Sequence, residues 1–482
     1  MEKGKIIELQ IDDMSNQGKG IGKFEGMAVF VDGAVYGDTV RAEVTKVKKR
    51  YAFARTVEIV EASEFRQEPY CQYMGQCGGC SLGLLNYDGQ LELKYKQVYD
   101  KLERIGEVEN PKVQPIIGMD DPWRYRNKAS MAVWTGGIIT RKGGIVENLD
   151  KPSVGFYKGK SHSVVDCEDC YLQAMPALAA AYALRQFMIE DNITAYDPKW
   201  DKGLMKNIIV KTAFNTGQVM VILVINGKGI PNHNKLVEMI NDEIYNLPPT
   251  EDGVYFNLES VVMNINKGKN ASLLTDECLT IAGKNVIREE LNGLVYEISP
   301  LAFYQVNPVQ TEKLYDKAME YADLKGGETV LDLYCGVGTI GLNAISRGAG
   351  KVIGIESVKG AVIDANRNAV INGIVNARYI CGKAEEVLPA MMAGEYEDDY
   401  FRIDRPEVVI LDPPRAGCDE RLLEAVCEAK AERIVYVSCD PSTLARDVKY
   451  LREHGYEFVE ATPVDMFPHT QHVECVVLMS RV

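Results

Sequence analysis

The sequence predicts an α/β protein with a C-terminal Rossmann-like sheet, preceded by a small β-barrel and a central α+β region. After about residue 300, buried-type strands such as VIGIE and RIVYVS alternate with helical stretches, as in doubly wound, mainly parallel sheets. Residues 1–60 instead form short alternating runs between Gly-rich turns, which is typical of a small barrel. A chain of 482 residues has room for about three domains.

The barrel is expected to span residues 1–60, with the Gly-rich stretch GKGIGKFEG as a turn. Its strands are predicted near Ile6–Ile11, Met27–Val31, Thr39–Val47 and Phe53–Val60. Small OB-like barrels commonly bind single strands of nucleic acid, although a packing or oligomerisation module is the alternative. A basic run is either a phosphate-facing patch or a solvated face: Lys46, Lys48, Lys49 and Arg50.

The central region is expected to cover residues 61–300, beginning with an irregular, Cys-rich segment at 61–90. Two hairpins are predicted in it, one around Asn215-Thr216-Gly217 and one around Asn292-Gly293, because such pairs favour tight turns between strands. The parallel-sheet domain is expected to follow at residues 301–482.

Composition limits the classes of function. A formal net charge of -15 excludes a surface that attracts nucleic acid everywhere, so any RNA contact needs local Lys and Arg. No apolar run reaches the roughly 18 residues of a membrane helix. The N-terminus lacks a secretory apolar region, so we expect a cytoplasmic protein without membrane contact, and a monomer. In that setting the 12 cysteines are expected to be free, metal-bound or catalytic.

A nucleotide site is predicted where the first strand of the sheet meets its helix. Asp332 ends an apolar strand, and Gly336 and Gly338 form a turn that lets the backbone approach a ligand. Glu356 closes the next strand at a spacing suited to ribose hydroxyls, which NAD and S-adenosylmethionine both carry. GVGTIG also fits the dinucleotide fingerprint, so a dehydrogenase is the alternative. The DPPR segment at 412–415 favours a methyltransferase that acts on bases.

A nucleophile and a base are predicted near the C-terminus. Cys439 ends an apolar run in YVSCDP, and Glu474 lies in HTQHVEC. A thiolate that adds to C6 of uracil makes C5 nucleophilic, and a base must later remove the C5 proton. A free thiol has a pKa of about 8.5, so we expect Arg415 or a helix N-terminus near Ser442 to stabilise its anion. The alternatives are an inert buried thiol and a surface carboxylate.

Four segments carry a family resemblance: DLYCGVGTIGL, DPPRAG, VSCDPSTLARD and MFPHTQHVECVVL. They resemble the signature segments of the 5-methyluridine RNA methyltransferases, specifically the large-subunit ribosomal RNA uracil-C5 branch, and the likeness covers nearly the whole chain. The resemblance implies a TRAM barrel at residues 1–60 and an S-adenosylmethionine-binding fold at the C-terminus. It makes Cys439 the nucleophile and Glu474 the base. It also implies four residues that contact the cofactor: Gln305, Tyr334, Glu356 and Asp412.

Two positions depart from the family pattern. This chain has Ala302-Phe303-Tyr304-Gln305 where the family usually has Ser-Phe-Phe-Gln, which alters the pocket wall. It has Lys383 where an acid is often found, which leaves the adenine contacts open.

A cysteine cluster is predicted from the spacing C-x5-C-x2-C of Cys71, Cys77 and Cys80. The segment DCEDCYLQ offers Cys167 or Cys170 as a fourth thiolate. The family resemblance favours Cys170 and a 4Fe-4S cluster, with a structural zinc site as the alternative.

The expected function is methyl transfer from S-adenosylmethionine to C5 of a uridine in large-subunit (23S) ribosomal RNA. The target base must be looped or flipped out to reach Cys439. The alternatives are a tRNA uridine-C5 methyltransferase, a cytosine-C5 RNA methyltransferase and a catalytically dead RNA-binding assembly factor. The cytosine enzymes need a further cysteine in the proline-bearing motif, and DPPRAG has none before Cys418.

Overall fold

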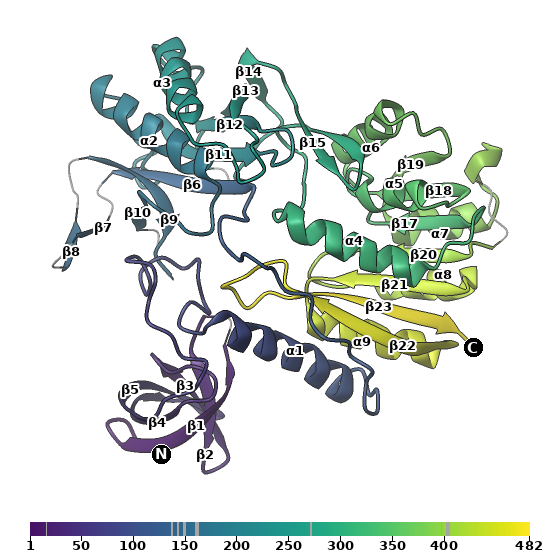
Figure 1. The fold of residues 1–482 in the computed structure, drawn as a ribbon, viewed down its shortest axis with the longest axis horizontal. Coiled ribbons are helices and arrows are strands. Elements are labelled where there is room, and N and C mark those ends of the chain that lie inside the picture. Colours follow the sequence, from purple (N-terminus) through teal and green to yellow (C-terminus); the bar gives the residue numbers. More distant parts are fainter. Residues whose placement is uncertain are drawn as a thin grey trace.

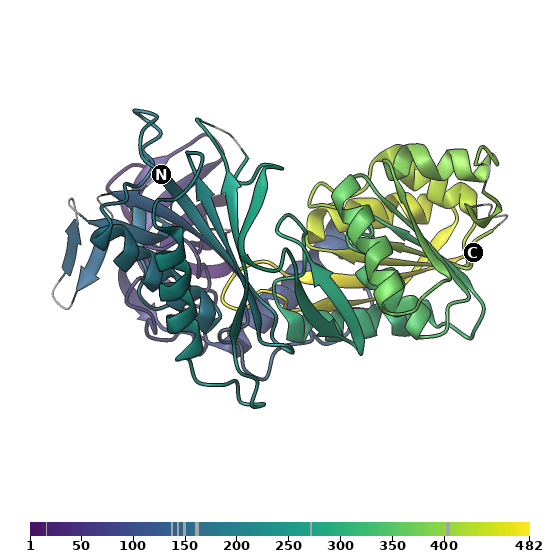
Figure 2. The same ribbon diagram turned by 90° about the horizontal axis from the view of Figure 1, so that it is seen from above.

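The computed structural model describes residues 1–15, 17–135, 138–141, 144–147, 151–159, 163–269, 272–396, 398–401 and 405–482. The chain passes from an N-terminal barrel through a central sheet with helices to a C-terminal α/β part (Figure 1). Viewed from above, the central and C-terminal parts form two lobes side by side (Figure 2). Among the described residues, no helix combines the length and apolar character required to cross a bilayer.

The N-terminal strands close into a barrel in the order β1-β2-β3-β5-β4. Their bounds are β1 (Ile6–Met14), β2 (Gly20–Phe24), β3 (Met27–Asp32), β4 (Thr39–Val47) and β5 (Tyr51–Glu61). The predicted barrel is confirmed, but the stretch expected as a turn contains β2. Gly22 explains the difference, because a Cβ there would lie 2.1 Å from the carbonyl oxygen of Gln10 on β1. Glycine inside a strand marks such a close approach of backbones.

The central sheet has the order β14-β13-β12-β11-β6-β9-β10-β7-β8. Its elements are β6 (Lys128–Thr135), β7 (Ile138–Arg141), β8 (Gly144–Glu147), β9 (Pro152–Tyr157), β10 (Val164–Asp166), α2 (Met175–Glu190), β11 (Met205–Thr212), β12 (Gln218–Ile225), α3 (His233–Tyr245), β13 (Asn257–Ile265) and β14 (Cys278–Gly283). Helices α2 and α3 cover the face that points away from the C-terminal part (Figure 2). The predicted hairpin around residues 215–217 is confirmed as β11–β12.

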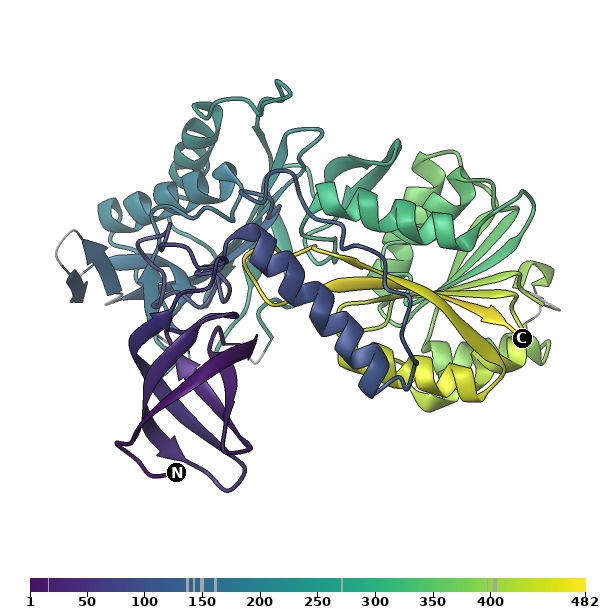
Figure 3. The same cartoon turned by 60° about the horizontal axis from the view of Figure 1, so that its bottom comes forward.

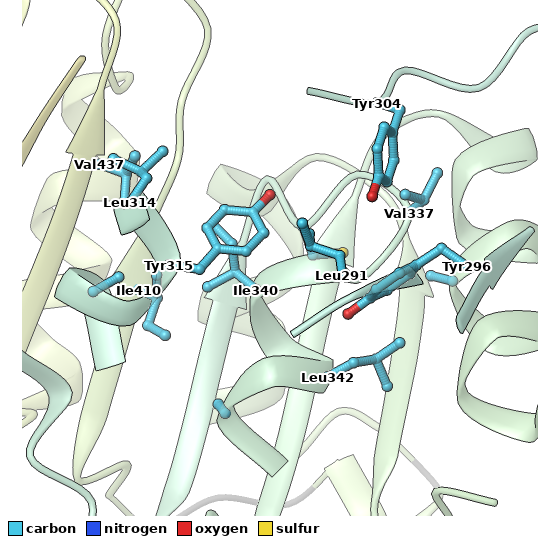
Figure 4. Close-up of a cluster of buried hydrophobic side chains, with 14 of the residues drawn as sticks. Leu291, Tyr296, Tyr304, Leu314, Tyr315, Val337, Ile340, Leu342, Ile410 and Val437 are labelled. Carbon is cyan, nitrogen blue, oxygen red and sulfur yellow. The ribbon is translucent and has the colours of Figure 1, made fainter. Parts of the chain in front are cut away.

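A second predicted hairpin, β15 (Ile287–Leu291) and β16 (Leu294–Ile298), is also confirmed. It packs against the C-terminal part, where the rings of Tyr296, Tyr304 and Tyr315 lie around the apolar side chains that follow β17 (Figure 4). Tyr304 lies beside Val337 of the glycine turn in this view. This buried contact fixes the segment that enters α4 against the edge of the C-terminal sheet.

The C-terminal sheet has the order β19-β18-β17-β20-β21-β23-β22. Its elements are α4 (Pro308–Ala322), β17 (Thr329–Leu333), α5 (Thr339–Ser346), β18 (Lys351–Glu356), α6 (Lys359–Ile371), β19 (Ala377–Cys381), α7 (Ala384–Met392), η1 (Asp399–Phe401), β20 (Val408–Leu411), α8 (Glu420–Ala429), β21 (Arg433–Ser438), α9 (Pro441–Glu453), β22 (Tyr456–Val464) and β23 (Glu474–Arg481). Strands β17 to β21 are parallel, and β23 runs antiparallel between β21 and β22. The predicted doubly wound sheet is confirmed. Its strand order reverses between β17 and β20, where such sheets form a crevice.

Helix α1 (Tyr87–Arg104) connects the N-terminal half to the C-terminal sheet. It lies against α9 and crosses beside β22 and β23 (Figure 3). On its buried face, the Nζ of Lys94 donates to Oδ1 of Asp465 at 2.5 Å and to the carbonyl oxygen of Phe467 at 3.0 Å. The side chains of Lys94 and Asp465 are both 0% exposed. Burial lowers the pKa of Lys94, while the carboxylate of Asp465 acts to raise it.

Replacement of Lys94 by Ala is expected to destabilise the protein strongly. The substitution leaves the Asp465 carboxylate buried without its cation, which costs about 3–5 kcal/mol. The matched control is Lys96→Ala on the same helix, since Lys96 pairs with Asp100 at a partly exposed site. The free energy of unfolding of this variant should fall by less than about 1 kcal/mol. Thermal melting of both variants measures the difference. Equal melting temperatures would contradict a structural role for the buried pair.

Candidate active site

The two residues predicted as nucleophile and base lie at the same edge of the C-terminal sheet. Cys439 directly follows β21, and Glu474 begins β23. The antiparallel register pairs Ser438 with Cys475. One further step along both strands therefore places Cys439 opposite Glu474, although 34 residues separate them in the chain.

The surroundings of Cys439 keep its thiol protonated at rest. Burial raises its pKa to about 11, and the nearby carboxyl groups of Glu474 and Asp412 act in the same direction. Arg415 opposes this shift, as expected from the sequence, but it does not outweigh it.

The N-terminus of helix α9 does not stabilise the anion of Cys439. Helix α9 begins at Pro441, and the side chain of its N-cap, Asp440, accepts hydrogen bonds from the backbone N–H groups of Ser442 and Thr443. These donors are therefore taken. Arg415 remains as the cation that acts on the thiol.

Glu474 has the pKa of a base that works near neutral pH. Its side chain is buried, with the residue 4% exposed. Burial raises its pKa to about 8, Asp412 raises it further, and Arg415 lowers it. A carboxyl group tuned in this way exchanges protons readily near physiological pH. Arg415 thus favours the anions of both Cys439 and Glu474.

Two more carboxyl groups lie at the carboxyl ends of the neighbouring strands. Asp412 follows β20, and burial raises its pKa to about 7. Asp332 on β17 is also fully buried, and burial raises its pKa to about 7. Asp412 acts in the same direction, whereas a hydrogen bond from a backbone N–H opposes the shift. Its Oδ2 accepts a hydrogen bond from the Gly341 N–H at 2.8 Å, while its Oδ1 has no partner within the described part of the chain. This concentration of acids suits a positively charged ligand.

The predicted nucleotide turn leaves room for a ligand beside Glu356. Gly336 has φ +54°, and a Cβ added there would meet no atom within 4 Å, so its backbone faces open space. Its N–H donates to Oε2 of Glu356 at 3.2 Å, and the N–H of Val358 donates to Oε1 at 2.8 Å. Glu356 is therefore held at the end of β18, next to the open backbone. This arrangement fits a ribose-binding carboxylate.

Tyr334 precedes this turn and has φ +66°, an unusual conformation for a residue other than glycine. Its N–H donates to the carbonyl oxygen of Ile355 at 2.9 Å. The half-buried ring lies near Cys418 and Asp419, on the side of α8.

Gln305 lies where the central sheet meets the C-terminal sheet. Its carbonyl oxygen accepts a hydrogen bond from Nδ2 of Asn127 at 2.9 Å. The preceding residue, Tyr304, packs beside Val337 (Figure 4). Its hydroxyl group, which departs from the family's Phe, is buried and has no hydrogen-bond partner among the residues that the structure describes.

The predicted cysteine ligands line one cavity of about 80 Å³, which opens to solvent. Five thiols face it: Cys71, Cys77, Cys80, Cys167 and Cys170. Aromatic and aliphatic side chains such as Phe156 and Leu172 complete the wall. Within the described residues, no three His, Cys, Asp or Glu side chains are grouped as ligands of a metal ion.

Several of these sulfurs accept hydrogen bonds. The N–H of Tyr73 lies 3.4 Å from the Cys71 sulfur, that of Gly79 is directed at Cys77, and those of Leu172 and Gln173 are directed at Cys170. Such N–H groups stabilise thiolates. By contrast, the Cys167 thiol donates to the carbonyl oxygen of Asp169 at 2.9 Å.

The cysteine segment also contacts the loop that leads to Glu474, a link that the sequence analysis missed. Directly after Cys80, the N–H of Leu82 donates to the carbonyl oxygen of His469 at 3.0 Å. Oγ of Ser81 accepts from the N–H of Gln471 at 3.2 Å. The His469 ring stacks on Trp123 with centroids 4.1 Å apart. The thiol cavity and the candidate base are thus connected through a few hydrogen bonds.

Comparisons with known proteins point to one family. A model of the tRNA (uracil-5-)-methyltransferase family matches residues 257–482, and a model of the TRAM domain matches residues 1–57. An uncharacterised RNA methyltransferase of Caldanaerobacter subterraneus is 44% identical over 478 residues, covering 99% of this chain and 98% of the relative. An uncharacterised RNA methyltransferase of Clostridium acetobutylicum is 39% identical and covers 100% and 98%.

A solved structure shares the whole architecture. The Pyrococcus abyssi tRNA (uracil-54, C5)-methyltransferase in complex with S-adenosyl-L-homocysteine superposes with a TM-score of 0.72 at 28% identity, covering 98% of this chain and 100% of that chain. The expected fold, the RNA uracil-5-methyltransferase family and the use of S-adenosylmethionine are thereby confirmed. The chain belongs to the S-adenosylmethionine-dependent RNA (uracil-5-)-methyltransferases that carry an N-terminal TRAM domain.

Proposed function

We propose that this enzyme methylates C5 of a uridine in large-subunit ribosomal RNA through a covalent adduct with Cys439. The observation that carries the proposal is the register of β21 and β23, which sets Cys439 opposite Glu474. A nucleophile and a base on facing positions can act on neighbouring atoms of one ring. C6 and C5 of uracil are such a pair of atoms.

In the proposed reaction, the Cys439 thiolate attacks C6, a carbon–sulfur bond forms, and the electron pair of the C5–C6 double bond moves into an enolate. C5 then takes the methyl group of S-adenosylmethionine, which leaves as S-adenosylhomocysteine. Glu474 removes the C5 proton, the double bond forms again, and the thiolate departs. Arg415 assists by stabilising the anionic forms of both residues.

The cofactor is proposed to lie over the open backbone at Gly336, with its ribose hydroxyls on Glu356. Gln305, Tyr334 and Asp412 surround this space in the proposal. Buried carboxyl groups at the crevice attract the sulfonium charge, which supports a place for the methyl donor beside Asp412.

Ribosomal RNA is the proposed substrate because the motif segments resemble the large-subunit branch of the family. The structural likeness to an enzyme that acts on tRNA favours tRNA as the second candidate. In either case we infer that the barrel contributes RNA contacts. The basic turn between β4 and β5 is exposed, and the half-exposed ring of Tyr51 lies 5.5 Å from that of Phe53, so charge for phosphates and a ring for stacking lie together.

The thiol cavity is proposed to hold a 4Fe-4S cluster through Cys71, Cys77, Cys80 and Cys170. The set of thiols around an open, mostly apolar cavity supports a cluster, and the N–H groups directed at the sulfurs suit thiolates. Cys167 is assigned no bond to the cluster, because its thiol is a donor to Asp169. Zinc is the alternative metal for these cysteines.

Cys439→Ala and Glu474→Gln are expected to fail at different steps. With labelled S-adenosylmethionine and transcripts of large-subunit rRNA fragments, Cys439→Ala should transfer no methyl group and still bind S-adenosylhomocysteine. Glu474→Gln should accumulate an RNA–protein adduct that migrates slowly in denaturing gels, because the C5 proton stays in place. Cys427→Ala, at a thiol on α8 away from the crevice, is the matched control. Normal turnover by Glu474→Gln, or label on a tRNA transcript alone, would contradict the proposal.

The rate at which methylated RNA is released from the adduct is expected to rise with pH around pH 8, because Glu474 removes the C5 proton after methyl transfer. Glu474 acts as a base only when deprotonated, and its pKa of about 8 leaves most of it protonated below that pH. Arg415 lowers this pKa, so Arg415→Gln should move the rise to higher pH. The control is Arg421→Gln at an exposed position of α8. Single-turnover rates of proton loss from C5, followed as tritium released from labelled uridine across this pH range, test the shift. A flat profile, or one that Arg415→Gln leaves in place, would remove Glu474 from the proposed role.

Alanine substitutions in the thiol cavity are expected to divide the five cysteines into two classes. Loss of Cys71, Cys77, Cys80 or Cys170 should each lower iron and acid-labile sulfide in anaerobically purified protein. Cys167→Ala should retain both, because its thiol is engaged with Asp169. Metal and sulfide analysis of the purified variants measures this. Stoichiometric zinc without sulfide in the wild type would contradict the cluster.

A further inference from the structure

Two lysines face each other in the central sheet. The antiparallel register of β6 and β11 pairs Lys128 directly with Lys211. Residues in such a pair extend their side chains from the same face, and like charges there destabilise the sheet. Lys211 is 4% exposed, and Lys128 is partly buried. The protein therefore places two lysines side by side on one face of the sheet, and one of them is buried.

Neither lysine is neutralised by a carboxylate within the described ranges of the chain. The Nζ of Lys211 donates to the carbonyl oxygens of Ser299 and Ala302, both at 2.8 Å. The acidic groups that act on Lys211 from a distance are Asp364 of α6 and Cys278 of β14. Burial and Lys128 outweigh them and lower the pKa of Lys211 to about 7, while burial alone lowers that of Lys128.

The two lysines line a small pocket, called here the cationic pocket, which also contains hydroxyl groups without partners. Its wall is formed by Asn127, Lys128, Lys211, Thr212, Ile287, Ile298, Ala302 and Tyr304. The hydroxyl oxygens of Thr212 and Tyr304 are buried, and neither has a hydrogen-bond partner among the described residues. Buried polar groups normally have partners. The two hydroxyl groups are therefore free to donate hydrogen bonds to a ligand in this pocket.

The cationic pocket lies next to the candidate active site. Asn127, one of its wall residues, donates its side-chain N–H to the carbonyl oxygen of Gln305. Tyr304, on another wall, packs beside Val337 of the glycine turn (Figure 4). The cationic pocket therefore adjoins Gln305 and the glycine turn, which both belong to the proposed cofactor site.

We infer that the cationic pocket is a binding subsite for an oxyanion, held by two ammonium groups and two hydroxyl groups. Two ligands of the proposed reaction carry such a group: the RNA through a backbone phosphodiester, and S-adenosylmethionine through its carboxylate. Either one offers several acceptor oxygens to the unpartnered donors and neutralises the lysine pair. The choice of these ligands rests on the proposed function, whereas the pocket itself does not.

Lys128→Gln tests the inference in two binding arms that require no methyl transfer. One arm measures affinity for transcripts of large-subunit rRNA fragments and of tRNA between about 50 and 200 mM salt. The other measures S-adenosylhomocysteine by calorimetry. An RNA phosphate in the pocket predicts an affinity about tenfold lower and a salt slope reduced by about 1. A cofactor carboxylate predicts a tenfold loss, about that of one charge-assisted hydrogen bond, in the second arm alone.

Lys228→Gln is the matched control, because Lys228 is exposed and follows β12 at the opposite end of the same sheet. Affinities of Lys128→Gln equal to those of Lys228→Gln in both arms would overturn the inference. A second measurement uses the wild-type protein and thus does not depend on folding of a variant. Acetic anhydride labels accessible lysines, and mass spectrometry should show that the RNA transcripts or S-adenosylhomocysteine protect Lys128. Labelling of Lys128 that neither ligand reduces would also overturn it.

Discussion

The segment from Asp465 to Glu474 is held from several sides, and the geometry of the crevice depends on it. Lys94 of α1 pairs with Asp465 inside the protein, and the residues after Cys80 hold the backbone at His469 and Gln471. Strand β23 begins at Glu474, three residues after Gln471. Because these anchors come from the N-terminal half, the position of the candidate base opposite Cys439 is a property of the whole chain.

Electrostatics explains why the crevice needs its ligands to become reactive. Burial and neighbouring carboxyl groups raise the pKa values of Cys439 and Glu474, so both residues favour their protonated forms in the absence of ligands. A sulfonium ion in the crevice would favour the anionic forms of both residues, since a positive charge lowers the pKa of nearby acids. In the proposed mechanism, the methyl donor therefore promotes formation of the Cys439 thiolate. Arg415 contributes in the same direction in the absence of ligand.

Much of this structure was predictable from the sequence because its signals are local. Apolar strands and Asn-Gly turns placed the parallel sheet and the hairpins, and the motifs ending in Cys439 and Glu474 pointed to one edge. Strand β2 was missed because its glycines indicate a turn, whereas a close approach of β1 requires them. Lys94 lies in a helix of polar appearance, and its partner is 371 residues away. The pairing of Lys128 with Lys211 follows from the register alone, which no local pattern encodes.

In the proposed reaction, the sulfur of Cys439 bonds to C6 of a uracil that is then methylated and deprotonated at C5. RNA that carries 5-fluorouridine tests it most directly, because fluorine cannot leave as a proton and the adduct cannot resolve. After incubation with S-adenosylmethionine and such RNA, mass spectrometry of digested protein should find the peptide with Cys439 linked to a methylated fluoropyrimidine. An unlinked Cys439 peptide, in protein that methylates the unfluorinated RNA at normal rates, would contradict the account.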